Sequence, residues 1–155
     1  MTTTEIPAAD VIDGDAPAGL VALRERFADG PPVGVAELIG MRPEVVEAGT
    51  VTFVCEASPR FANPMGTVHG GIIATLLDSA MGCAVQTLQP EGTAYTTLSL
   101  EVKYLRPVTV DAGRLRATGT VVHAGRRQAT AEGRLVDDAG RVLATATTTC
   151  LVFSL

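Results

Sequence analysis

Residues 69–85 read His-Gly-Gly-Ile-Ile-Ala-Thr-Leu-Leu-Asp-Ser-Ala-Met-Gly-Cys-Ala-Val, and this stretch decides the fold. As a helix it would be apolar on nearly all sides, so other structure must wrap it. Its most apolar part, Ile72 to Val85, is too short to span a bilayer and is interrupted by Asp78. The stretch therefore predicts one long buried helix that begins after His69.

The sequence downstream of this helix has the period-two alternation of β-strands. The first strand alternates polar residues with Leu98, Leu100, Val102 and Tyr104. Three further strands are expected at about 114–123, 128–136 and 142–153, because Gly125 and Asp138-Ala139-Gly140 supply turn residues between them.

Upstream of the helix, Leu20, Leu23, Arg24 and Phe27 fit a short helix that ends before Gly30. A short strand is expected at 35–39, and a longer one at 45–57 that is broken near 48–49. Proline and glycine predict a loop at 58–68. Residues 1–17 are acidic and lack apolar periodicity, so we expect a flexible arm followed by one domain over 18–155.

Small residues recur at alternate positions of the last three strands and allow a thick element to approach the sheet closely. They are Ala117 and Gly119, then Ala129, Ala131 and Gly133, then Ala144 and Ala146. The apolar helix is the obvious partner, although ordinary strand alanines would give the same residues. The predicted fold class is α+β: one long helix cradled by a curved antiparallel sheet, in the order β-β-α-β-β-β-β.

Composition restricts the class of protein. A net charge of −5 disfavours nucleic-acid binding, and 46% hydrophobic residues suffice for one core. Three cysteines without paired spacing argue against a disulfide scaffold or a zinc site. The N-terminus shows no signal-peptide pattern, so a cytoplasmic protein with reduced thiols and no membrane partner is expected.

The run Asn63-Pro64-Met65-Gly66-Thr67-Val68-His69-Gly70-Gly71, followed by Leu77-Asp78-Ser79-Ala80, resembles the hotdog-fold thioesterases of the phenylacetyl-CoA thioesterase (PaaI-like) group. This group lies within the 4-hydroxybenzoyl-CoA thioesterase superfamily. The later run from Tyr95 to Leu100, leading to Tyr104-Leu105-Arg106-Pro107, is also similar to that group. The resemblance covers about residues 33–153. It implies hydrolysis of an acyl-CoA to a carboxylic acid and CoA, with no cofactor because CoA is part of the substrate.

Asp78 is the main catalytic candidate, because a carboxylate in an apolar helix is costly to bury without a purpose. It could act as general base or as nucleophile; a structural ion pair or cap is the alternative. The resemblance implies that the Gly70 N–H, at the helix N-terminus, stabilises the oxyanion and that Gly71, beside it, contacts the substrate. His69 is a further candidate, and orienting the loop is the more natural role for it than proton transfer.

The spacing of Gly70 and Asp78 predicts an oligomer. Eight residues on one helix correspond to about 12 Å, so one thioester carbon cannot lie about 3 Å from both groups. If both act on one carbonyl they must come from different chains, which requires a homodimer or a dimer of dimers. His69 and Asp78 are too far apart on one helix to chelate one ion, and no metal is predicted.

The remaining candidates depend on the resemblance. It implies that Asn63 helps to hold the substrate carbonyl or the attacking water and that Thr97 positions the water, although an ordinary turn Asn and strand Thr would look the same. Alternation places Thr97 on the polar face with Ser99. The hairpin residues that would contact CoA are His123, Gly125, Arg126 and Arg127.

Other functions are less consistent with the sequence. There is no GxSxG motif, no phosphate-binding loop and no evident histidine partner for Cys83 or Cys150. A non-catalytic acyl-CoA sensor on the same scaffold is the main alternative, and Asp78 argues against it. A hotdog dehydratase or hydratase ranks last. The acyl group stays open, with aromatic and medium-chain acids as candidates.

Overall fold

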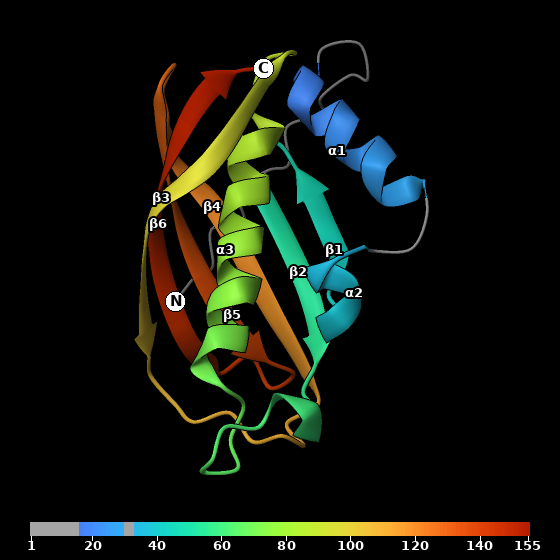
Figure 1. The fold of residues 1–155 in the computed structure, drawn as a ribbon, viewed down its shortest axis with the longest axis vertical. Helices are drawn as coiled ribbons and strands as arrows, with labels where there is room; N and C mark the ends of the chain where they lie inside the picture. Colours follow the sequence, from blue (N-terminus) through green and yellow to red (C-terminus); the bar gives the residue numbers. More distant parts are fainter. Residues whose placement is uncertain (1–15, 30–32) are drawn as a thin grey trace, which may run out of the picture.

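The computed structural model describes residues 16–29 and 33–155 (Figure 1). Most of the expected N-terminal arm, residues 1–15, lies outside the described residues. The predicted long helix is α3, Gly70–Thr87, two residues longer at its C-terminus than the apolar stretch suggested. No helix in the described ranges is long and apolar enough to cross a membrane.

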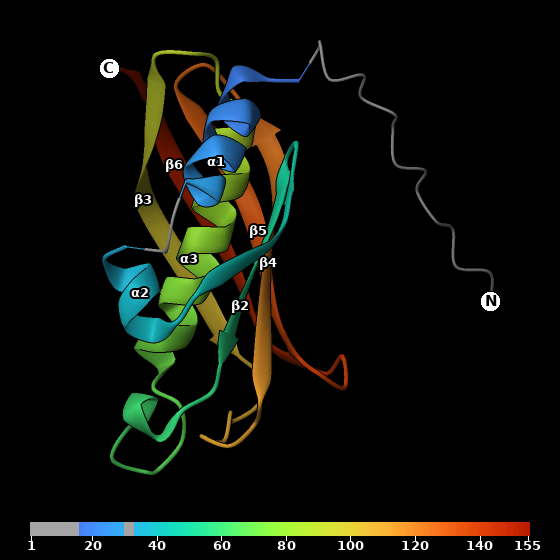
Figure 2. The ribbon, with the colours of Figure 1, turned by 90° about the vertical axis from the view of Figure 1, so that its right-hand side faces the viewer.

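Six antiparallel strands form one sheet that curves around α3 (Figures 1 and 2). Their bounds are β1 Arg42–Glu47, β2 Thr50–Glu56, β3 Thr93–Tyr104, β4 Arg114–Ala124, β5 Gln128–Asp137 and β6 Val142–Ser154. The order across the sheet is β1-β2-β4-β5-β6-β3, so β3 pairs only with β6 and its other edge is free in the single chain. The predicted α+β hotdog architecture is confirmed.

The small strand residues do make room for α3. A Cβ added at Gly119 would lie 2.4 Å from the backbone of Ala80 and Met81, and one at Gly133 would lie 3.0 Å from the Met81 sulfur. Contacts this short leave no space for a side chain, so the helix backbone rests directly on β4. Leu76 and Leu77 of α3 are fully buried, and Leu77 lies against Gly133. An all-round apolar helix is stable here because sheet and helices cover it.

The expected strand at 35–39 is wrong. Val35–Ile39 is a short helix, α2, between Gly34 and Gly40, both with positive φ. Gly40 ends it in the left-handed conformation, and the Met41 N–H donates to the Ala36 carbonyl. The β-branched residues at its two ends suggested a strand, but glycines at both flanks allow a single helical turn instead.

The two N-terminal strands are instead a hairpin within 42–56, turning at Ala48-Gly49 where the sequence predicted a break. The single turn η1, Pro59–Phe61, then leads into the loop before α3.

The predicted N-terminal helix is confirmed as α1, Ala18–Ala28, which packs beside the C-terminal half of α3 (Figure 1). A Cβ at Gly19 would lie 2.1 Å from the Gln86 carbonyl oxygen, so the two helices touch through backbone. The Arg24 guanidinium donates twice to the Val46 carbonyl, at 3.1 and 2.9 Å, and fastens α1 to β1.

Candidate active site

The N-terminus of α3 is shaped by His69. Its Nδ1 accepts a hydrogen bond of 2.8 Å from the Gly71 N–H, which makes His69 the N-cap of the helix. The His69 N–H donates to the Phe61 carbonyl at 2.7 Å, and its own carbonyl accepts from Ile72 and Ile73. No described group accepts a hydrogen bond from the Gly70 N–H. The first turn of α3 therefore presents one free backbone donor, at Gly70.

Asn63 shapes the loop in front of this turn. Its Oδ1 accepts from the N–H groups of Met65 and Thr67 at 2.9 and 3.1 Å, and its Nδ2 donates to the Thr67 hydroxyl at 2.9 Å. Asn63 thus has the ordinary role of a turn asparagine. One of its two Nδ2 hydrogens has no partner among the described residues, so a contact with substrate stays a prediction.

Asn63 and Gly70 line one surface hollow of about 250 Å³, together with Tyr104 at the end of β3. The Tyr104 hydroxyl donates to the Gly70 carbonyl at 2.9 Å. The loop carrying Asn63 is anchored nearby, because the Val68 N–H donates to the Val108 carbonyl at 2.8 Å. These contacts form the first half of the candidate site.

Asp78 and Thr97 form a second half farther along α3. Asp78 is partly buried, and its Oδ1 accepts a hydrogen bond of 2.9 Å from the Thr97 hydroxyl. Asp78 has no ion-pair partner among the described residues, and no basic residue lies in α3. The alternative of a structural ion pair for Asp78 therefore has no support in the described part of the single chain.

Thr97 reaches Asp78 because of a β-bulge. The register between β3 and β6 shifts between Thr97 and Ser99, so Leu98 lies outside the alternation and is 59% exposed. After the bulge, Leu100 packs against the core on the same side as Thr97. The expected alternation, with Thr97 beside Ser99 and Leu98 in the core, is wrong at this point, while the choice of Thr97 as a neighbour of Asp78 is consistent with the contact.

The surroundings of Asp78 keep nearby thiols protonated. Burial raises the pKa of Cys83 to about 11; the Tyr95 hydroxyl opposes this shift and the Asp78 carboxylate adds to it. Burial likewise raises the pKa of Tyr95 and of Cys150. The neutral thiol is a poor nucleophile, so neither cysteine is a good candidate nucleophile at neutral pH.

The predicted CoA-contacting residues lie at the β4–β5 hairpin. The Gly125 N–H donates to the Gln128 carbonyl at 2.9 Å, and the Arg126 and Arg127 side chains are exposed without an ion pair to any described residue. Ala129, next to the turn, and Thr97 both pair with Cys150, so the hairpin lies at the level of Thr97. In one chain the hairpin therefore belongs with the Asp78 half.

The structure thus sorts the predicted residues into two groups and does not join them. Neither Asp78 nor Thr97 lines the hollow of Gly70. Along α3, Gly70 and Asp78 are separated by eight residues, about 12 Å. A single carbonyl group in either place would reach only one of them.

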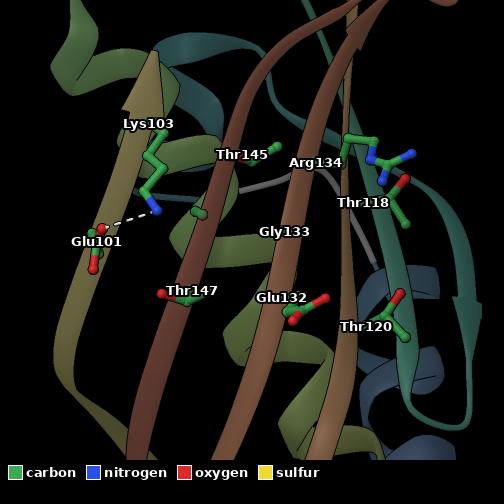
Figure 3. Close-up of a pocket in the computed structure, with 10 residues that line it drawn as sticks. Glu101, Lys103, Thr118, Thr120, Glu132, Gly133, Arg134, Thr145 and Thr147 are labelled. Carbon is green, nitrogen blue, oxygen red and sulfur yellow. Dashed lines mark ion pairs between the residues drawn. The ribbon is translucent and has the colours of Figure 1, made fainter. Parts of the chain in front are cut away.

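Another hollow, of about 540 Å³, lies on the sheet over β3–β6 and holds none of the predicted site residues (Figure 3). Figure 3 shows Glu101 and Lys103 of β3, whose ion pair measures 3.5 Å, and β6 separates them from Glu132 and Arg134 of β5. Its lining comes from strands alone and includes no helix N-terminus, so we do not assign the chemistry to it.

The N-cap gives a first prediction. His69→Ala removes the acceptor of the Gly71 N–H and should lower the free energy of unfolding by about 1 kcal/mol in urea denaturation. His123→Ala is the matched control, because His123 is the only other histidine and is exposed; its effect should stay below about 0.5 kcal/mol. Equal stability of the two variants would show that the cap contributes nothing.

Sequence reasoning missed two tyrosines. Tyr104 bonds to Gly70, and Tyr95 packs so closely on α3 that a Cβ at Gly82 would lie 2.5 Å from its hydroxyl. Both lie in runs that carried the resemblance, and both share the helix-facing side of β3 with Thr97. Alternation along β3 could have indicated that these tyrosines face α3. It could not identify Gly70 and Gly82 as the residues they contact, because periodicity within one strand carries no information on contacts with another element.

Comparison with known proteins shows the family to which the chain belongs. Residues 65–144 match the family described as the thioesterase superfamily, which is more than half of the chain. A solved thioesterase structure from Ralstonia eutropha, described as a phenylacetic acid degradation-related protein, is 31% identical with a TM-score of 0.74 and covers 83% of this chain and 97% of its own.

Two curated relatives agree with this assignment. The 1,4-dihydroxy-2-naphthoyl-CoA hydrolase of Listeria monocytogenes is 25% identical over 72% of this chain and 89% of its own length. A protein of Halobacterium salinarum named as an esterase is 43% identical over 76 residues; there the matched part spans about half of the relative, 48% of its length, and 48% of this chain. The chain therefore belongs to the thioesterase superfamily, and it is a thioester hydrolase with the hotdog fold.

Proposed function

We propose that the protein hydrolyses an acyl-CoA in sites that two copies of the chain complete together. Asp78 of one copy activates water or attacks the thioester carbonyl, and the Gly70 N–H of the other copy stabilises the oxyanion. The observation that carries this proposal is the separation of the two groups on α3: each is equipped for one part of the reaction, and one chain cannot bring both to one carbon.

The edge strand supports a specific way of joining the halves. Thr97 bonds to Asp78 and Tyr104 bonds to Gly70, so β3 carries both halves seven positions apart. If β3 pairs antiparallel with β3 of a second copy about an axis near 100–101, Thr97 of one copy lies opposite Tyr104 of the other. This follows because antiparallel partners have a constant sum of residue numbers, to within the one position by which the bulge at Leu98 can shift the register. The pairing would bring Asp78 toward the partner's Gly70.

The free edge itself favours association. A strand of twelve residues with one unpaired side exposes a row of backbone donors and acceptors, which proteins normally cover or pair. Leu98 and Phe153 add exposed apolar surface at β3 and its neighbour, at 59% and 41%.

The substrate class follows from the basic hairpin and from the relatives. Exposed guanidinium groups at Arg126 and Arg127 suit the phosphates of CoA, because arginine binds phosphate through paired N–H donors. The names of the Listeria and Ralstonia proteins point to aromatic acyl groups. We therefore propose aromatic acyl-CoA thioesters as the first substrates to test, with medium-chain esters as the comparison, in a thiol-release assay.

Mixing two inactive variants tests the shared site. Asp78→Asn removes the carboxylate, and Gly70→Pro removes the N–H. In a mixed dimer, one of the two sites combines the intact Asp78 of one chain with the intact Gly70 of the other. Random pairing of equal amounts gives half mixed dimers, so co-refolded chains should recover about a quarter of wild-type activity per chain.

The controls for the mixture are each variant refolded alone, which should stay inactive. If mixing restores no activity although native mass spectrometry detects the mixed dimers, the two groups do not act across chains and the proposal fails. A strictly monomeric active protein would also contradict it.

A further inference from the structure

We propose that Tyr104 is a positioning residue for the hydrolysis, one that fixes the first peptide of α3 so that the Gly70 N–H faces the reacting carbonyl. This inference rests on the proposed function, because it concerns the oxyanion donor of that site. It assigns a task to a side chain that neither the sequence motifs nor the carboxylate chemistry required.

The peptide between Gly70 and Gly71 is bound on both sides. Its carbonyl oxygen accepts from the Tyr104 hydroxyl at 2.9 Å, and its N–H donates to His69 Nδ1 at 2.8 Å. The two side chains come from different elements, β3 and the N-cap, and lie 35 residues apart in sequence. One peptide unit is therefore fixed by two hydrogen bonds in addition to the helix itself.

The ring of Tyr104 also covers Gly70. A Cβ added at Gly70 would lie 3.1 Å from both Cζ and Oη of Tyr104, which is closer than nearly all real contacts of a Cβ. Tyr104 thus packs on the glycine Cα while its hydroxyl reaches past it to the carbonyl. The close approach explains why this position carries no side chain.

Such restraint matters because two consecutive glycines are the most flexible pair that a chain can place at a helix start. A backbone donor stabilises a transition state only when it already points to the position of the developing charge. With the Gly70–Gly71 peptide fixed by Tyr104 and His69, and the His69 carbonyl bound by Ile72, the Gly70 N–H has little freedom left. Tyr104 supplies the restraint that comes from outside the helix.

If Tyr104 had only a structural role, removing its hydroxyl would lower the stability of the protein and leave kcat unchanged. Tyr104 is 52% exposed, so removing its hydroxyl leaves no buried polar group without a partner except the Gly70 carbonyl, which the helix can also satisfy. We therefore expect little loss of stability when the hydroxyl is removed, and the effect should appear in the chemical step.

The test is Tyr104→Phe, which keeps the ring and deletes the hydroxyl. The value of kcat should fall about 5- to 10-fold, while KM changes less than about twofold and Tm stays within about 2 °C of wild type. An unchanged kcat, a loss confined to KM, or a lower Tm with normal kcat would each overturn the inference.

A double-mutant cycle shows whether Tyr104 acts through Gly70. In the Gly70→Pro background the N–H is absent, so adding Tyr104→Phe should reduce kcat no further. Independent, multiplying losses would mean that the hydroxyl acts elsewhere, and would overturn the inference.

Asp78→Asn separates this outcome from failure of the proposed function. If that variant stays active, the proposed chemistry fails. If Asp78→Asn is inactive while Tyr104→Phe has normal activity, only the role of Tyr104 is refuted.

Discussion

Asp78→Asn is expected to reduce kcat for acyl-CoA hydrolysis by about 10²–10⁴-fold, the usual contribution of a positioned base. Asparagine has nearly the same shape, and its side-chain carbonyl can still accept the hydrogen bond that Thr97 donates at 2.9 Å. It can neither take a proton from water nor attack a carbonyl. The loss therefore follows whether Asp78 acts as general base or as nucleophile.

The measurement is thiol release with an aromatic acyl-CoA, together with circular dichroism and the oligomeric state of the variant. Asp111→Asn is a matched control, because Asp111 is an exposed carboxylate in the loop before β4 and should leave kcat within about twofold of wild type. Full activity of Asp78→Asn in a folded oligomer would exclude Asp78 from the reaction. Because removing a partly buried charge seldom destabilises, unfolding should not confuse the result.

The buried helix was predictable because its signal is strong. Residues 69–85 contain one charged side chain, Asp78, and a helix this apolar must be covered by other structure. Small residues on three strands indicated the sheet surface on which it packs. In contrast, the segment 35–39 is too short for periodicity to separate helix from strand. Its conformation depends on the positive φ values of Gly34 and Gly40. Glycine permits such values but does not require them, so the sequence alone does not predict them.

Thr97 illustrates a second limit of pattern reading. Strict alternation assigns Thr97 and Ser99 to one face, yet the bulge at Leu98 places Thr97 on the face of α3, where it meets Asp78. A bulge inserts one extra residue into a strand but does not require a particular residue type. The sequence around Leu98 therefore gives no sign of it. Thr97 stays a prediction that rests on the resemblance, because the alternation offered in its support is wrong at the bulge.

The candidate site shows which kind of information a single sequence holds. The distance between Gly70 and Asp78 follows from helix geometry alone, and so does the prediction that two chains must share a site if both groups act on one carbonyl. The contact of Tyr104 with Gly70 spans 34 residues and depends on how β3 crosses the helix, which only the folded chain determines. The sequence therefore predicts distances within one helix, but it does not predict side-chain contacts between different elements.

Gly70→Pro is expected to lower kcat about 10²–10³-fold, the usual cost of removing one oxyanion donor. The backbone conformation at this position suits proline. Gly70 is the first residue of α3, where proline is well tolerated, and His69 has φ −60° and ψ 132°, a conformation favoured before proline. Since the Gly70 N–H donates to no described group, its loss in the proline variant removes no hydrogen bond among the described residues.

Gly70→Ala is the control that isolates the N–H. Alanine and proline both add a Cβ that meets the Tyr104 ring at 3.1 Å, so both must displace that ring by a few tenths of an ångström. Alanine keeps the donor, and proline removes it. We expect the alanine variant to retain at least about ten times the kcat of the proline variant, with similar Tm values. Equal rates would mean that the crowding of Tyr104 causes the whole loss, and that the oxyanion is stabilised by another group.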